Sequence, residues 1–283
     1  MKKYSFEDLE GKVCVLTGGG GVIGAVLASG LAQVGVKLAI LDIKKEFADK
    51  VANKVVDDYG IEAIGVEANV LDKSSLENAK KIILEKYAKV DVLINGAGGN
   101  SPKATTKDEF ITDDNLNSLE NTFFGLELEG FQKVFDLNFL GTLLPTMVFA
   151  KEMVERKEGV ILNVSSMNSF RSLTKIPAYS AAKASINNFT EWLAVHFAKM
   201  NVRVNAIAPG FFLTNQNRFL LVDENTNEPT PRGKKIIDNT PMGKYGEAED
   251  LIGGTLFLLS DVSSFITGVV LPIDGGFNIY SGV

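Results

Sequence analysis

The stretch that decides the fold reads Thr17-Gly18-Gly19-Gly20-Gly21-Val22-Ile23-Gly24. An apolar, valine-rich run over residues 12–17 comes before it, and a helical pattern over residues 22–34 comes after it. Glycines allow the backbone to turn tightly and to approach a pyrophosphate, whose charge the N-terminus of the following helix stabilises. Four consecutive glycines could also form only a flexible turn, but the strand before them and the helix after them favour a dinucleotide-binding unit.

Asp42 closes the next apolar run, at about the 20-residue distance typical of the acidic residue in such units. An aspartate at that position accepts hydrogen bonds from the ribose hydroxyls of NAD and repels the 2′-phosphate of NADP. We therefore expect NAD, although Lys44 and Lys45 keep NADP open. The same carboxylate could instead serve as the N-cap of the helix that follows it.

Short runs of valine, isoleucine and leucine alternate with longer helical patterns along the chain. Buried strands are expected at residues 12–17, 37–42, 61–66, 90–95, 160–164, 202–206 and 269–273, and helices at 22–34, 44–59, 74–88, 131–156, 178–200 and 247–260. Gly35 and Gly60 are expected beyond helix C-termini, Asp72 at an N-cap and Pro177 in a first turn.

This alternation predicts an α/β fold, a Rossmann-like doubly wound parallel sheet of about seven strands with helices on both faces. The sequence contains no internal repeat and no linker rich in proline or serine, so we expect a single domain over residues 1–283. Two polar stretches, residues 99–130 and 211–240, interrupt the alternation after strands. Long insertions after strand C-termini usually cover the ligand crevice of an open α/β sheet, although both could be plain surface loops.

The composition restricts the partners. The chain has 283 residues, of which 45% are hydrophobic and 23% charged, so it can form a large core and is not disordered. A formal net charge of −6 argues against nucleic acid and anionic membranes as partners. Because the sequence shows neither a secretory h-region nor an apolar run of membrane-spanning length, we expect a cytoplasmic protein. The single Cys14 has no partner for a disulfide or metal site, and His196 is expected in helix packing or a subunit interface.

A tyrosine and a lysine four residues apart indicate acid–base chemistry. Tyr179 and Lys183 are expected on one face of the helix that opens after Pro177. A nearby ammonium favours the phenolate, which lowers the tyrosine pKa and allows proton transfer near neutral pH. Ser166 ends a strand thirteen positions before the tyrosine, where its hydroxyl could polarise a carbonyl oxygen, and Asn138 stands in an otherwise apolar helix.

Further motifs are collinear with these residues: Asn95-Gly96-Ala97-Gly98 after the fourth strand, Pro209-Gly210 with Thr214 after the sixth, and Asp274-Gly275-Gly276 near the C-terminus. Together with the glycine stretch and the set Asn138, Ser166, Tyr179 and Lys183, they resemble the short-chain dehydrogenase/reductase family over nearly the whole chain. The resemblance implies hydride transfer between a nicotinamide dinucleotide and an alcohol or ketone carbon.

The resemblance also implies roles for individual residues. Tyr179 would be the general acid/base and Ser166 would orient the substrate. Lys183 would bind the nicotinamide ribose and lower the Tyr179 pKa, and Asn138 would hold a proton-relay water. The implied cofactor-binding residues are Gly18, Gly20, Gly21, Val22, Ile23, Gly24, Asp42, Asn69, Val70, Asn95, Ala97, Gly98, Tyr179, Lys183, Pro209, Gly210, Phe212 and Thr214. The family is usually tetrameric, so a homotetramer built on the helices at 131–156 and 178–200 is expected.

Three positions depart from the family pattern. Val22 replaces the middle glycine of the cofactor motif, which shifts the pyrophosphate turn onto Gly20 or Gly21. Gly96 replaces the second asparagine of the fourth-strand motif. Asn69 stands where an aspartate often contacts the adenine amine. None of these changes touches the four catalytic candidates, so activity is still expected.

The stretches around Asn100, Asn168 and Thr214 resemble the branch of the family that interconverts D-fructuronate and D-mannonate. A polyhydroxylated acid needs amide partners and a cation. The expected substrate-binding residues are Asn100, Lys103, Ser166, Asn168, Tyr179, Asn215, Gln216 and Arg218, with Asn217 and Arg171 also available.

Several alternatives stay open. The substrate could be another keto-sugar acid, as in gluconate 5-dehydrogenases, or a small ketone. Phe211, Phe212, Phe219 and Leu220 also leave an apolar substrate possible. The chain could be a non-catalytic dinucleotide sensor, but a sensor has no need of the proton-transfer set. A methyltransferase shares the glycine turn and the acidic residue, but has no use for Tyr179 and Lys183.

Overall fold

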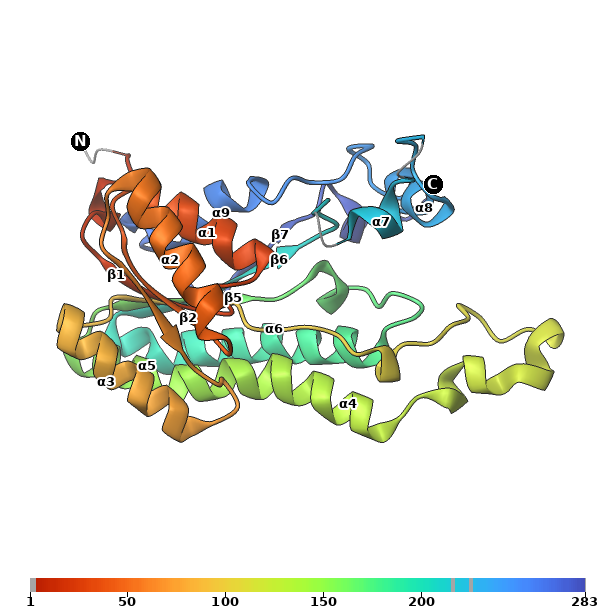
Figure 1. The fold of residues 1–283 in the computed structure, drawn as a ribbon, viewed down its shortest axis with the longest axis horizontal. Helices are drawn as coiled ribbons and strands as arrows, with labels where there is room; N and C mark the ends of the chain where they lie inside the picture. Colours follow the sequence, from red (N-terminus) through yellow and green to blue (C-terminus); the bar gives the residue numbers. More distant parts are fainter. Residues whose placement is uncertain (1–3, 215–216, 224–225, 283) are drawn as a thin grey trace.

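In a computed structural model, which describes residues 4–214, 217–223 and 226–282, seven parallel strands form one sheet (Figure 1). The strand order is β3-β2-β1-β4-β5-β6-β7. The strands are β1 (Val13–Thr17), β2 (Lys37–Asp42), β3 (Ala63–Glu67), β4 (Val92–Asn95), β5 (Gly159–Val164), β6 (Val202–Pro209) and β7 (Val270–Ile273). Every predicted strand is confirmed, and the order reverses direction between β1 and β4, where an open α/β sheet has its ligand crevice.

Helices cover both faces of this sheet. On one face lie α1 (Val22–Gln33), α2 (Lys45–Tyr59) and α9 (Asp250–Leu259); on the other lie α3 (Lys73–Tyr87), α5 (Gly141–Arg156) and α6 (Pro177–Phe197), with α4 (Leu128–Phe135) packed against α6 (Figure 1). Two apolar cores result, one around Leu16 and Leu31 and the other around Leu93 and Phe149. The Rossmann-like doubly wound prediction is therefore confirmed.

The predicted helix ends are mostly confirmed. The Asp72 carboxylate caps α3 by accepting hydrogen bonds from the backbone N–H groups of Ser74 (2.8 Å) and Ser75 (3.3 Å). Gly60 closes α2 with a left-handed φ of 69°, and Pro177 opens α6. The alternative role of Asp42 as N-cap of α2 is wrong, because Lys44 occupies that position.

The helix expected over residues 131–156 is confirmed as an unbroken helical run, but its hydrogen-bond type changes within it. A π-helical segment, Asp136–Leu140, separates α4 from α5. Within it the Asn138 side chain donates to the Val134 carbonyl (2.8 Å), and the Asn138 carbonyl accepts from the Thr142 hydroxyl (2.9 Å). Side chains that enter the backbone ladder in this way relax it, and such segments often accompany functional sites.

The two polar stretches lie at the same end of the molecule (Figure 1). Residues 99–130 form three short 3-10 turns, Pro102–Ala104, Asp113–Asn121 and Phe123–Gly125, that extend beyond α4. Residues 211–240 are partly helical, with α7 (Arg218–Leu221) and α8 (Pro231–Asp238). An ion pair between Glu109 and Lys235 joins the first stretch to α8.

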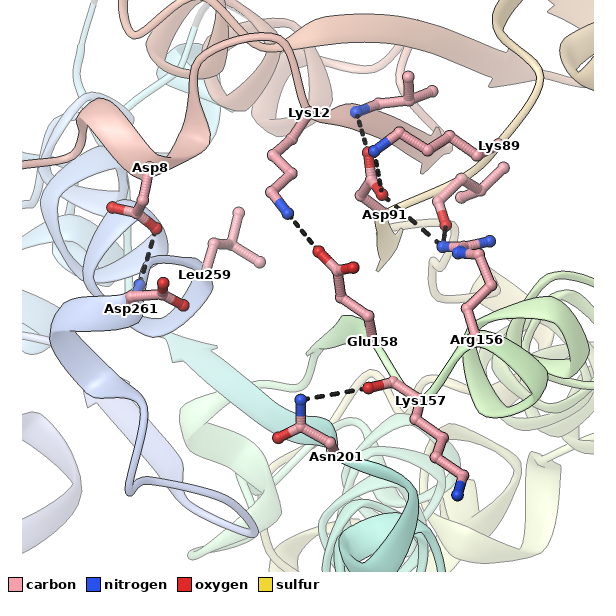
Figure 2. Close-up of polar contacts among 12 residues, drawn as sticks. Asp8, Lys12, Lys89, Asp91, Arg156, Lys157, Glu158, Asn201, Leu259 and Asp261 are labelled. Carbon is pink, nitrogen blue, oxygen red and sulfur yellow. Dashed lines mark hydrogen bonds and ion pairs between the residues drawn. The ribbon is translucent and has the colours of Figure 1, made fainter.

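An ion-pair network occupies the opposite edge of the sheet, where the strands begin (Figure 2). Asp91, only 3% exposed, accepts a hydrogen bond from the backbone N–H of Val13 (3.0 Å). Its other oxygen pairs with Lys89 (3.0 Å) and lies 3.7 Å from Arg156. These contacts bind the starts of β1 and β4 to the end of α5.

Two other features of the sequence also have their place in the fold. Cys14 lies fully inside β1, and burial raises the pKa of its thiol, which makes it unreactive. Across the described parts of the chain, no helix has both the length and the apolar character of a membrane span.

Candidate active site

A cleft of about 940 Å³ opens at the carboxyl edge of the sheet. Most of the residues expected to bind a cofactor line it: Gly18, Gly21, Val22, Ile23, Gly24, Asp42, Asn69, Val70, Ala97, Gly98, Gly210, Phe212 and Thr214. It also includes residues of α4 that the sequence did not indicate, among them Gln132 and Lys133. Periodicity gives no sign of them, because they are ordinary polar positions of an amphipathic helix.

The glycine stretch forms a tight turn against the start of α1. Gly18 has φ +64°, and a Cβ there would lie 2.8 Å from Cα of Ala97. A Cβ at Gly24 would lie 2.6 Å from the carbonyl oxygen of Gly18. The lack of side chains therefore lets the turn, the loop after β4 and the helix N-terminus meet at the cleft, and this cradle fits a pyrophosphate group.

The Asp42 carboxylate closes one end of this cradle. Its Oδ2 accepts a hydrogen bond from the backbone N–H of Gly20 (3.2 Å), and its Oδ1 accepts one from that of Lys44 (3.1 Å). Gly20 itself faces Asp42 and Phe47, since a Cβ there would lie 2.6 Å from Cβ of Phe47. The half-buried carboxylate lines the cleft where a ribose would follow the pyrophosphate.

Five of the expected cofactor residues do not line the cleft: Gly20, Asn95, Tyr179, Lys183 and Pro209. The Asn95 side chain is buried and donates hydrogen bonds to Thr146 (3.0 Å) and Asn163 (2.9 Å), so it joins β4 to α5 and β5. Pro209 is the buried last residue of β6 and positions the loop after it. Asn69 does line the cleft, and its Oδ1 accepts from the backbone N–H of Leu71 (3.0 Å).

The tyrosine, the lysine and the serine meet as the sequence predicted. Tyr179 lies in the first turn of α6, and Lys183 follows one turn later with its Nζ 5.7 Å from the centre of the tyrosine ring. Ser166, two residues beyond the end of β5, lies close enough to the Tyr179 hydroxyl to act against the rise in its pKa. Lys183 is only 4% exposed, and its Nζ donates to the carbonyl of Val164 (2.8 Å).

Burial dominates the protonation of this pair. It raises the pKa of Tyr179, and the hydrogen bond with Ser166 opposes that rise. Burial lowers the pKa of Lys183 to about 8. The expectation that Lys183 holds the Tyr179 pKa below its ordinary value is therefore wrong for this structure, because Lys183 lies over the ring face and is itself desolvated.

Asn138 links this group to the cleft. Its side chain donates to the carbonyl of Gly99 (2.7 Å) and accepts from the N–H of the same residue (3.3 Å). A Cβ at Gly98 would lie 2.7 Å from Oδ1 of Asn138 and 3.1 Å from Nζ of Lys183. Two of the catalytic candidates, Asn138 and Lys183, therefore meet the expected cofactor site at Gly98 on the cleft wall.

The expected substrate residues differ in their surroundings. Asn168 is 6% exposed, lies next to Ser166, and has a buried Oδ1 with no hydrogen-bond partner. Asn100 donates to Thr105 (2.9 Å), Lys103 pairs with Glu127 (3.0 Å) and Glu129 (3.1 Å), and Arg218 donates to Asn227 (3.1 Å). Asn215 and Gln216 lie outside the described residues.

The C-terminal segment also borders the site, which the sequence did not indicate. The Phe277 ring packs edge-on against Phe211, with ring centres 5.2 Å apart. Arg171, just beyond the turn that Ser166 caps, donates to the carbonyl of Tyr280 (3.3 Å). Both contacts join residues that are far apart in the sequence, so local patterns could not reveal them.

Comparison with known proteins agrees with this geometry. The family model described as enoyl-(acyl carrier protein) reductase matches residues 20–278. An uncharacterised oxidoreductase from Haemophilus influenzae is 51% identical over 98% of this chain and 96% of its own. The 5-keto-D-gluconate 5-reductase of Escherichia coli K12 is 30% identical, over 95% of this chain and 96% of its own.

A solved structure is equally similar. It is a protein from Haemophilus influenzae provisionally described as a D-mannonate oxidoreductase, with bound NAD. Its TM-score is 0.91 and its identity 51%, with 98% of each chain covered. The Rossmann-like sheet, the Ser166–Tyr179–Lys183 group and these matches lead to one conclusion: the chain belongs to the short-chain dehydrogenase/reductase family and is an oxidoreductase.

Proposed function

We propose that the protein interconverts the alcohol and ketone forms of a sugar acid, D-mannonate and D-fructuronate, with NAD(H) as the cofactor. The observation that carries the proposal is the grouping of Tyr179 with Ser166 and Lys183, with Lys183 next to Gly98 on the wall of the dinucleotide-sized cleft. It supports a reaction in which a proton and a hydride reach one carbonyl group from two sides.

The residues around the cleft fit the cofactor. The glycine cradle would hold the pyrophosphate, Asp42 the ribose of the adenosine half, and Lys183 the ribose of the nicotinamide half. Asp42 favours NAD because a second negative charge next to its carboxylate is repelled. The bound NAD in the Haemophilus influenzae neighbour supports this choice. When bound, NAD(H) would accept or supply the hydride.

The side chains of the site would handle the proton. In the reducing direction the Tyr179 hydroxyl donates its proton to the carbonyl oxygen, and in the oxidising direction the phenolate takes it back. The Ser166 hydroxyl, next to the Tyr179 hydroxyl, would polarise the same oxygen. Asn138 keeps the loop at Gly99 in place and would hold a relay water next to Lys183.

Sugar-acid recognition has support from polar groups near Ser166. The buried Asn168 Oδ1 has no partner, and a substrate hydroxyl would satisfy it. Arg171 donates to a carbonyl and meets no carboxylate within the described residues, so it is available for the acid group. The charge of Lys103 is already balanced by Glu127 and Glu129. Among the relatives, the Escherichia coli enzyme is named for a keto-sugar acid, 5-keto-D-gluconate.

The test measures NADH and NADPH oxidation with D-fructuronate, 5-keto-D-gluconate and neutral ketoses. Strong NADH turnover with D-fructuronate that disappears in Tyr179→Phe is the expected result. Turnover confined to 5-keto-D-gluconate or to a neutral ketone contradicts the substrate and keeps the reaction class. Binding of NADH without turnover of any substrate contradicts the proposal and favours the sensor alternative.

The proposal extends to a homotetramer. Met147 on α5 and Trp192 and Val195 on α6 are exposed apolar side chains, and Val195 is 80% exposed. Trp192 also stacks on His196, with ring centres 4.5 Å apart. Exposed apolar groups on neighbouring helices favour a subunit interface. Light scattering should give four times the chain mass, and Val195→Glu should reduce it; a monomeric wild type contradicts this assembly.

A further inference from the structure

We infer that Asn187, which neither the family motifs nor the proposed function assigns, is a positioning residue that sets Ser166 against Tyr179. Its side chain bridges Ser165, directly before the catalytic serine, and Ser169, three residues after it. The inference rests on the proposed roles of Ser166 and Tyr179.

The bridge begins on the strand side of Ser166. Ser165 is 2% exposed and its hydroxyl donates to Oδ1 of Asn187 (2.5 Å). The backbone N–H of Ser165 donates to the carbonyl of Ile207 on β6 (2.8 Å). The residue before the catalytic serine is therefore held by the sheet on one side and by α6 on the other.

The bridge continues on the turn side. Nδ2 of Asn187 donates to the hydroxyl of Ser169 (2.8 Å), and that hydroxyl donates to the carbonyl of Ser166 (2.5 Å). The backbone N–H of Ser169 donates to the same carbonyl (2.9 Å). Both ends of the Asn187 amide are thus used, one on each flank of Ser166, which fixes how the amide is oriented.

The position of Asn187 on α6 connects this bridge to Tyr179. Tyr179, Lys183 and Asn187 are successive i, i+4 positions on α6 and share one face. The helix that carries the tyrosine therefore also fixes the short turn that carries the serine. The group charged at neutral pH that faces the Tyr179 ring is Lys183 of the same helix, and Ser166 faces its hydroxyl from the end of β5.

The neighbouring residue provides a matched control. Asn188 is exposed, whereas Asn187 is partly buried. Asn187→Ala should lower kcat about 10- to 100-fold, the range expected when reacting groups move by a fraction of an ångström to about 1 Å. Its KM for NADH should stay unchanged, and Asn188→Ala should match the wild type in both constants.

Two further variants separate positioning from a general loss of structure. Asn187→Asp keeps an acceptor for Ser165 but loses the donor to Ser169, so its kcat should fall as in Ser169→Ala. Because Asn187 and Ser169 act through one chain of hydrogen bonds, the double variant Asn187→Ala/Ser169→Ala should lose no more activity than the worse single variant. Losses that multiply contradict the inference.

The decisive readout is the ionisation of Tyr179, followed by tyrosinate absorbance in the NAD complex without substrate. The difference between wild type and Tyr179→Phe isolates this residue among the six tyrosines. Because the Ser166 hydrogen bond lowers the Tyr179 pKa, loosening it in Asn187→Ala should move the titration to higher pH. An unmoved titration overturns the inference, even if the variant is less stable. Full activity of Tyr179→Phe would instead refute the proposed function.

Discussion

The backbone N–H of Gly20 donates a 3.2 Å hydrogen bond to Oδ2 of Asp42, which connects the glycine turn directly to the end of β2. The residue expected to select the cofactor thus also holds the turn expected to bind its pyrophosphate. Changing Asp42 should affect both properties together.

Asp42→Ala should raise the KM for NADH about 10- to 100-fold, since hydrogen bonds to a charged group contribute about 1.5–3 kcal/mol. The KM for NADPH should fall, because the repulsion of the 2′-phosphate is removed. Initial rates with both cofactors measure the change. Asp49→Ala is the control, because Asp49 is an exposed carboxylate that pairs with Lys45 on α2. An unchanged preference between the two cofactors contradicts the role of Asp42.

Lys183→Met should abolish most activity and yet stabilise the fold at pH 7. Burial lowers the folded-state pKa of Lys183 to about 8 from 10.5. Between these values the unfolded chain binds more protons, so the wild type gains stability as pH rises, on the order of 3 kcal/mol in total. Below pH 8 the buried Lys183 ammonium lowers the free energy of unfolding by its full amount.

Urea unfolding at pH 7 and pH 10, at one protein concentration, tests this prediction. The free energy of unfolding of Lys183→Met should exceed that of the wild type at pH 7. This difference in stability should shrink at pH 10. Lys81→Met, at an exposed position of α3, should follow the wild type at both pH values. A Lys183→Met protein that is less stable at pH 7 shows that the Val164 contact outweighs the burial penalty.

Arg171→Met should raise the KM for the sugar acid about 10- to 100-fold and leave the KM for NADH unchanged. The reason is that Arg171 has donors left after its bond to Tyr280. Steady-state kinetics with D-fructuronate measures the effect. Lys103→Met should leave both constants unchanged, because its ammonium already has two carboxylate partners. A large rise in the KM for the sugar acid in Lys103→Met, with no rise in Arg171→Met, would show that Lys103 and not Arg171 binds the acid group.

Asp91→Asn should destabilise the protein by about 2 kcal/mol without altering its kinetic constants. The change removes the charge that pairs with Lys89 and Arg156 (Figure 2), at the edge of the sheet opposite the cleft. Denaturant unfolding gives the loss as a lower midpoint. Glu158→Gln breaks only the more exposed pair with Lys12 and should cost less than about 1 kcal/mol. Equal losses for the two variants contradict the importance of burial.

Much of the fold was predictable because its elements have local signals. The apolar runs located all seven strands, and β6 alone extends well past its expected end, to Pro209. Helix α8 lies in the polar stretch over residues 211–240 and is not among the expected helices, although Thr230 and Pro231 are typical of a helix start. The π segment at Asn138 has no such signal, since it depends on side-chain contacts with Gly99 and Thr142.

The sequence predicted which residues form the catalytic group, but not the direction in which the pKa of Tyr179 shifts. Motif spacing brought together Ser166, Tyr179 and Lys183, and the structure brings the three into contact. The direction of the Tyr179 pKa shift was wrong, because burial is a tertiary property that spacing cannot report. The role of Asn187 has no sequence signal for the same reason, since its two serine partners lie on another segment of the chain.

The placement of the Asp91 network at the strand starts has an evolutionary consequence. All seven strands run the same way, so one rim of the sheet carries the ion pairs and the other carries the cleft. Mutations at well-separated sites have nearly additive effects on stability. A lineage can therefore rewrite the segments after β4 and β6 for a new substrate while the opposite rim keeps the framework folded. In this architecture, selection can change the substrate specificity and maintain the stability of the fold through different sets of residues.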